Sequence, residues 1–152
     1  MPSTFALDVR EFVKKTKLRA DAAVRGIVTY IVVKIDSRSP VGNPSYWKSP
    51  APRDYKPGRF RKNWQLSIGS PIRTPVLGED ASGTATVSSN LSVIPDKAAG
   101  HVYYFANNLD YARRLEDGYS PQSGPNAMVG LTMVEAEINV KQAVAKAKAA
   151  YP

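Results

Sequence analysis

The side chains that could do chemistry are few, and their spacing does not build a catalytic or metal site. His101 is the only histidine, and no carboxylate stands at a metal-ligand spacing from it, whereas zinc sites and Ser-His-Asp triads need several partners. We therefore expect His101 to be structural or exposed to solvent. The adjacent acids Glu116 and Asp117 are not a convincing acid–base pair. Glu135 and Glu137 stand two residues apart, so a helix would point them to different sides.

Composition and the absence of motifs exclude further classes. The 152 residues include no cysteine, which excludes disulfides, thiolate zinc sites and a cysteine nucleophile and suits a cytosolic protein. Neither a G-x-x-x-x-G-K-[ST] loop nor a G-x-G-x-x-G turn occurs. The longest apolar run, residues 27–33, is too short for a membrane span, and residues 1–6 do not resemble a secretory signal. We expect no enzyme, no cofactor, no metal and no membrane contact.

One segment could bind a ligand through charge and stacking, and its sequence is GRFRKNW, residues 58–64. Arg59, Arg61 and Lys62 could contact phosphate while the aromatic rings stack on bases. The alternative, which we favour, is that Phe60 and Trp64 anchor the core where a loop enters a strand, because no complete RNA-binding motif is present. Phosphate contact stays open, since it needs charge and not a motif.

The net charge of +8 is concentrated in the first 62 residues. Residues 1–35 carry seven Lys/Arg and three acids, residues 36–62 carry seven and two, and the remaining 90 residues carry seven and eight. This asymmetry indicates either a polyanionic partner or a solvated basic face.

The helices and strands expected from the sequence pattern predict an α+β fold of one domain, residues 1–152. We expect long N-terminal and C-terminal amphipathic helices packed on a small, mostly antiparallel sheet, with a long Pro-rich arm. Residues 7–35 predict the first helix, whose apolar stripe contains Val9, Phe12, Val13, Thr16, Ala20, Ala23, Val24, Ile27 and Ile31. Val28, Val32 and Val33 lie off this stripe, so this part of the helix should be covered on a second side, for which a neighbouring subunit is a candidate.

The Pro-rich arm is expected over residues 37–62, which hold five prolines and two glycines. Proline fixes φ and removes a donor, so regular structure is not expected there, and loops this long are generally functional or disordered. Large aromatic side chains tend to cover a surface. We therefore expect the arm to lie on a partner or a neighbouring subunit through Tyr46, Trp47, Tyr55 and Phe60.

The rest of the chain predicts strands followed by two helices. Trp64, Leu66 and Ile68 alternate with Asn63, Gln65 and Ser67, which predicts a half-buried strand with Asn63 and Gln65 on the side away from the core. Residues 84–88 predict a second strand, residues 89–94 a short helix or irregular segment, and residues 101–106 a third strand. A short helix is expected at residues 111–116, with Gly118 as its left-handed cap. Residues 129–151 predict the last helix, with Pro125 in its first turn and one face made of Met133, Ala136, Val140, Ala143 and Ala147.

Two segments carry a resemblance to a known family. They are HVYYFANNLDYARRLEDGYSPQSGPNAMVGLTM, residues 101–133, and SPVGNPSYWKSPAPRDYKPGRFRKNWQ, residues 39–65. In order and spacing they resemble the neck or tail-completion proteins of long-tailed bacteriophages, the tail-component family. The resemblance implies that the corner at Gly118 sets how Tyr111, Leu115 and Tyr119 meet the C-terminal helix.

The resemblance also implies a function, a location and partners. It implies a structural virion protein, made in the host cytoplasm, that forms a homo-oligomeric ring, with six subunits expected, and joins the tail to the DNA-filled head. Its partners would be head-closure or connector proteins and tail-tube or tail-terminator proteins, with Arg59, Arg61 and Lys62 near packaged DNA. Two alternatives stay open: a tail terminator that caps the tube, and a free nucleic-acid-binding protein.

Overall fold

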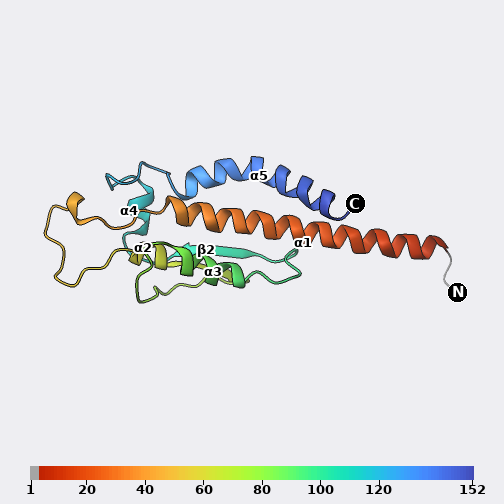
Figure 1. Cartoon of the computed structure of the whole chain (residues 1–152), viewed down its shortest axis with the longest axis horizontal. Helices are drawn as coiled ribbons and strands as arrows, with labels where there is room; N and C mark the ends of the chain where they lie inside the picture. Colours follow the sequence, from red (N-terminus) through yellow and green to blue (C-terminus); the bar gives the residue numbers. More distant parts are fainter. Residues whose placement is uncertain (1–3) are drawn as a thin grey trace.

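The computed structural model describes residues 4–152 and has the expected α+β architecture. The elements in chain order are α1 (Thr4–Arg38), a 3-10 turn η1 (Pro44–Tyr46), α2 (Arg59–Lys62), β1 (Trp64–Ile68), α3 (Thr84–Ser92), β2 (Tyr103–Asn107), α4 (Ala112–Glu116) and α5 (Val129–Ala150). The molecule is elongated, and α1 runs along most of its length (Figure 1). Helix α5 lies along one side of α1, while the two strands and α3 lie along the other (Figure 1).

Helix α1 confirms the predicted helix, but a different face of it is buried. Val28 and Val32, which lie off the predicted stripe, are buried and pack with Leu66. The second side of α1 is thus covered at Val28 and Val32 by the chain's own sheet and α3, whereas Val33 is 40% exposed. The predicted stripe residues Val9 and Phe12 are exposed.

The sheet consists of β1 and β2, which pair antiparallel from Trp64 opposite Asn107 to Ile68 opposite Tyr103. Both strands confirm predictions, with β2 shifted by two residues at its start and one at its end. The side chain of Asn90 in α3 covers the other edge of β1: its Oδ1 accepts from the Leu66 amide at 2.8 Å and its Nδ2 donates to the Trp64 carbonyl at 2.8 Å. An exposed strand edge invites unwanted pairing, and this contact blocks it.

The predicted strand at residues 84–88 was wrong, because these residues begin α3. Asp80 stands before the helix and accepts hydrogen bonds from the Gly83 amide, the Thr86 amide and the Thr86 hydroxyl at 2.8–3.0 Å. Helices begin with unpaired amides, and a carboxylate that accepts from them stabilises the helical start. These hydrogen bonds also hold the pKa of Asp80 below its usual value, against the opposing effect of its burial.

Trp64 stands at the centre of a second apolar cluster, which joins α1, α2 and the start of α5. Its ring stacks on Phe105 at 5.1 Å, and its indole N–H donates to the Ser39 hydroxyl at 2.7 Å. Asn63, expected on the side away from the core, is instead fully buried. Its amide group exchanges hydrogen bonds with the Val76 backbone and so fixes the loop after β1.

The corner between α4 and α5 is held by backbone geometry and by one carboxylate. Gly118 follows α4 with φ +85°, as predicted for a left-handed cap. The Glu116 carboxylate accepts from the amides of Val129 at 3.1 Å and Gly130 at 2.8 Å, where α5 begins. A carboxylate at a helix N-terminus is favourable for hydrogen bonding and for the helix dipole. Pro125 lies before this start and not in the first turn of α5.

Helix α5 turns its small side chains towards α1. Thr132, Ala136 and Ala147 are buried, whereas Met133 and Val140, which were expected on the same face, are exposed. The prediction of that face was correct for the alanines and wrong for the two larger residues. Small residues let the helix axes approach closely, which leaves the larger apolar side chains of α5 on other faces.

We predict that Trp64→Ala destabilises the fold by roughly 3–5 kcal/mol, the range for deleting a large buried aromatic ring. Trp47→Ala is the matched control, because Trp47 is 40% exposed and its loss should cost about 1 kcal/mol or less. Urea unfolding followed by circular dichroism gives both values. Equal losses for the two variants would contradict the central position of Trp64.

Candidate functional site

A concave site lies at one end of the molecule, where the Pro-rich arm returns to α2 and α4. It is a cavity of about 380 Å³. Its wall combines four aromatic side chains with an arginine and polar groups, and the main lining residues are Trp47, Tyr55, Arg59, Phe60, Tyr111, Ser120 and Gln122. An apolar pocket with a few polar groups at its margin is the usual form of a binding site.

Local interactions give the arm its shape. The Asn43 side chain accepts from the Ser45 amide at 3.0 Å and so starts the η1 turn. Trp47 and Tyr55 then meet edge to face, with ring centroids 4.7 Å apart. Gly42 leaves room beside them, because a Cβ at that position would overlap the Tyr55 hydroxyl and displace the ring.

The arm is also tied to the corner between α4 and α5. The Gln122 side-chain amide donates to the Val41 carbonyl at 2.9 Å. Burial raises the pKa values of Tyr55 and Tyr111, and the Arg59 guanidinium opposes this rise at Tyr111. Both phenols are therefore neutral near pH 7 and can act as hydrogen-bond donors at the cavity wall.

The four aromatic residues predicted as partner contacts differ in position. Tyr46 and Trp47 are exposed on the arm, and Tyr55 is half-buried behind them. Phe60 is only 5% exposed, because its ring packs against Trp64 and Tyr111 with centroids 5.8 and 6.1 Å away. The structure therefore places Phe60 in the core and at the cavity wall, which is the core-anchor alternative, and leaves Tyr46, Trp47 and Tyr55 as the candidate contact residues.

The three residues predicted to contact phosphate also differ in their hydrogen bonding. The Arg61 guanidinium donates to the carbonyls of Ser37, Ser39, Ala81 and Ser82 at 3.0–3.3 Å, so it stabilises the end of α1 and the loop before α3. The side chains of Arg59 and Lys62 make no hydrogen bond or ion pair within residues 4–152. These two cations, and not Arg61, remain available to a phosphate.

Beside Arg61 lies a buried carboxyl group. Asp36 is 4% exposed, and its Oδ1 has no hydrogen-bond partner within residues 4–152. Burial raises its pKa to about 6; the Arg61 charge opposes the rise and the Asp80 charge adds to it. Gly83 makes room for this carboxyl, since a Cβ there would overlap Asp36 Oδ2.

Two further titratable residues, Glu135 and His101, form contacts outside the cavity. Glu135 accepts from Arg38 at 2.8 Å and from the Tyr30 hydroxyl at 2.6 Å, and these hydrogen bonds lower its pKa. The exposed His101 lies 3.1 Å from the Lys97 carbonyl. Among residues 4–152, no group of three or more His, Cys, Asp or Glu could hold a metal ion. No helix in the same range is long and apolar enough to cross a membrane.

Comparison with known protein families, curated proteins and solved structures found no match to this chain. The resemblance of residues 39–65 and 101–133 to the phage neck proteins therefore rests on those residues alone.

Sequence reasoning missed two residues of the cavity. Tyr111 was expected to meet the C-terminal helix, but its ring lies beside Phe60 at the cavity wall. Gln122 carries the hydrogen bond to the arm, and it lies 81 residues beyond its partner in the chain. No periodicity in either segment indicates a contact over that separation.

We predict that Asp36→Asn raises stability at pH 8 by up to about 3 kcal/mol. The raised pKa means that the native carboxyl contributes stability below the unfolded pKa of 3.8, and that this contribution is lost as pH rises through about 6. The gain from asparagine should therefore shrink as pH falls from 8 to 4. Asp54→Asn, on the exposed arm, is the control and should follow the wild-type pH profile in thermal melts. A wild-type profile in Asp36→Asn would refute the prediction.

Proposed function

We propose that the chain is a structural protein of a bacteriophage neck, which completes the tail and joins it to the DNA-filled head as a subunit of an oligomeric ring. The observation that carries this proposal is the arm, an extended segment at one end of the molecule whose exposed aromatic residues stand beside a cavity (Figure 1). The resemblance of residues 39–65, which include this arm, supports the same class.

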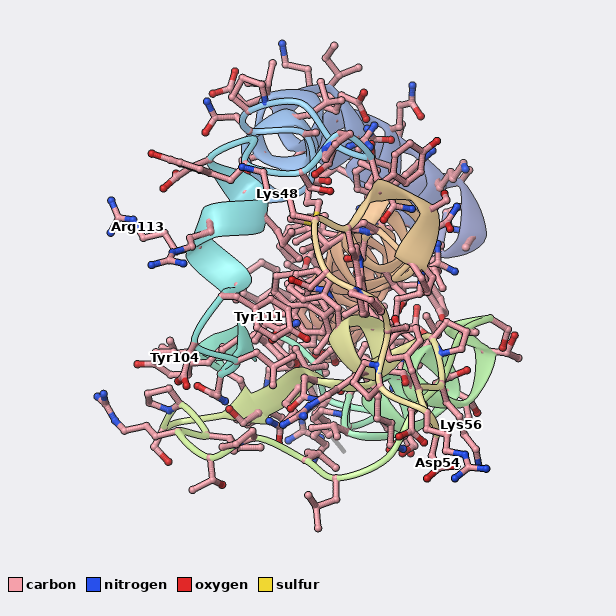
Figure 2. The ribbon with its side chains drawn as sticks, turned by 90° about the vertical axis from the view of Figure 1, so that its left-hand side faces the viewer. Lys48, Asp54, Lys56, Tyr104, Tyr111 and Arg113 are labelled. Atoms are coloured by element: carbon pink, nitrogen blue, oxygen red, sulfur yellow. The ribbon has the colours of Figure 1, made fainter. Side chains whose placement is uncertain are left out.

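The arm has the properties of a connection between proteins. Tyr46 and Trp47 are 54% and 40% exposed, and aromatic residues of this kind often supply most of the binding energy at an interface. Figure 2 looks onto this end: Arg113 points outward from α4, Asp54 and Lys56 lie at the opposite margin, and Tyr111 lies between them. An apolar segment of a head or tail protein could fill the aromatic cavity while the charged margin contacts its flanks.

The basic residues support a weak role beside DNA. Arg59 lines the cavity, and Lys48 and Lys56 are exposed on the same arm. Diffuse positive charge binds phosphate without reading sequence, which suits the lumen of a ring through which DNA passes. Because Arg61 is held by four carbonyls, a charge reversal that tests this role should change Arg59 and Lys62 and leave Arg61 in place.

The two alternative functions predict different experimental results. A tail terminator would use the same ring and arm but cap the tube before the head arrives, so its loss would give tails of uncontrolled length. A free nucleic-acid-binding protein would bind DNA by itself, and its affinity would fall by orders of magnitude between about 50 and 200 mM salt.

We predict that phage particles made without this chain contain DNA-filled heads and complete tails that do not join. The wild-type chain supplied in trans should restore joining. The double variant Tyr46→Ala, Trp47→Ala should fail to restore it, because two exposed aromatic contacts at an interface contribute about 2 kcal/mol or more. Leu77→Ala is the matched control, since Leu77 is 89% exposed on another loop. Normally joined, infectious particles in the absence of the chain would overturn the proposed function.

A second prediction concerns the arm before assembly. Lys48 and Arg53 are exposed on it, and exposed loops are the preferred sites of proteolytic cleavage. Limited trypsin digestion of the free chain should therefore cut first at these residues, and assembled particles should protect them. Mass spectrometry of the fragments identifies the sites. Equal protection in the free and assembled chain would contradict a partner-contacting arm.

A further inference from the structure

The N-terminal end of α1 projects beyond the rest of the molecule (Figure 1). We call residues 4–18 the α1 tip. Helix α5 ends beside Arg19, whose side chain donates to the Tyr151 carbonyl at 2.7 Å. Glu11, Lys14, Lys15 and Leu18 of the tip line one pocket together with Ala150, Tyr151 and Pro152, so the part that overhangs is residues 4–10, about 10 Å. Its large apolar residues are exposed, with Phe5 at 77% and Phe12 at 67%.

The tip exposes a row of apolar side chains. It extends a helix that is already formed, but most helical stability in proteins comes from packing of an apolar face. Phe5, Val9 and Phe12 recur at steps of four and three residues, so they form one row. The row continues further along α1 to Tyr30, whose hydroxyl donates to Glu135 of α5. The tip thus presents the same face that α5 covers elsewhere, and residues 4–10 lie beyond the end of α5.

A second uncovered apolar surface lies on α5. We call Leu131, Val134 and Ile138 the α5 ridge; they are 44%, 73% and 64% exposed. They recur at steps of three and four residues, on the side of the helix opposite Thr132 and Ala136, which pack on α1. Large apolar side chains therefore point outward from α5 while small ones point inward. This is the reverse of the usual arrangement in a surface helix.

We infer that the α1 tip of one copy of this chain docks on the α5 ridge of a second copy. One contact of this kind covers both apolar surfaces. Charge favours the same pairing: residues 4–18 carry four Lys/Arg and two acids. Residues 129–140 carry no base and two acids, of which Glu135 is bound by Arg38 of its own chain and Glu137 is exposed. Self-pairing of two tips would instead bring eight bases and four acids together and would leave the α5 ridge uncovered.

The contact joins different surfaces on the two copies, so it is heterologous. The tip lies at one end of the molecule, and the ridge lies on the half of α5 nearer the other end (Figure 1). Such head-to-tail contacts generate a ring where the rotation closes. The inference thus names the subunit contact of the ring in the proposed function, on which it rests only for the expectation of closure.

The absence of cysteine makes cross-linking a direct test. Purified full-length Phe12→Cys and Val134→Cys, each exposed in the free chain, are mixed at high concentration and treated with a short bifunctional maleimide. The expected product is a cross-linked dimer containing one chain of each variant. A single chain carrying both cysteines should give a ladder of covalent multimers that stops at the ring size.

Three controls decide the outcome. Leu77→Cys mixed with Phe12→Cys should not cross-link, since that loop lies outside the contact. Val134→Glu in the chain with both Phe12→Cys and Ile138→Cys should abolish the ladder while circular dichroism shows an unchanged fold, because the side chain is exposed. A cross-link from Phe12→Cys alone that is faster than the mixed product would overturn the inference in favour of tip self-pairing, and absence of the mixed product would overturn it outright.

The cross-linking result stands apart from the phage experiment. Mixed dimers together with normally joined particles lacking the chain would leave the contact standing and remove the neck function. Unjoined heads and tails without mixed dimers would support the neck function and overturn the proposed contact between the α1 tip and the α5 ridge.

Discussion

The structure depends on how the last turn of α1 is held. A helix ends with carbonyl groups that have no partner within it, and here side chains from distant elements supply partners. The Ser39 hydroxyl donates to the Ile35 carbonyl and accepts from the Trp64 indole, while Arg61 donates to the carbonyls of Ser37 and Ser39. A cation at this end also interacts favourably with the helix dipole. The sheet is thereby fixed to α1 by hydrogen bonds as well as by apolar packing.

The same turn also fixes α5 and the arm. The Arg38 guanidinium reaches Thr132 and Glu135 on α5 at 2.8 Å, and the extended part of the arm follows directly after Ser39. One end of a 35-residue helix is therefore rigidly tied to the other elements, while its opposite end, the α1 tip, projects away from them. This arrangement gives the chain two separate surfaces for assembly: the aromatic arm at the fixed end, and the helical faces that run towards the free end.

Most elements could be predicted from local pattern, because periodicity, caps and alternation are properties of neighbouring residues. The long helices, β1, β2 and the Gly118 cap are of this kind. Helix α3 could not be predicted, since residues 84–88 alternate like a strand. The Asp80 carboxylate stabilises its start, and Asn90 holds it to the backbone of β1. The buried face of α1 was missed for a related reason: Val28 and Val32 are covered by Leu66, Ile94 and Ala98, and no pattern within α1 indicates which distant residues pack there.

The residues of the candidate site also fall into those that could be predicted from the sequence and those that could not. Exposed aromatics in a Pro-rich arm are visible in the sequence, so Tyr46 and Trp47 could be singled out. Phe60 and Arg61 belong to the same basic, aromatic segment, yet one is buried in the core and the other is held by four backbone carbonyls. Composition cannot distinguish a cation that is free to bind a partner from one that is hydrogen-bonded within its own chain. The difference depends on which backbone carbonyls the fold leaves unpaired.

The central claim is that this chain works as a subunit of a closed assembly, and its mass in solution tests that claim most directly. Native mass spectrometry of the purified protein at increasing concentration, and of the neck released from particles, should reveal one closed multiple of 16.6 kDa that Val134→Glu removes. A protein that stays at 16.6 kDa under both conditions would contradict it.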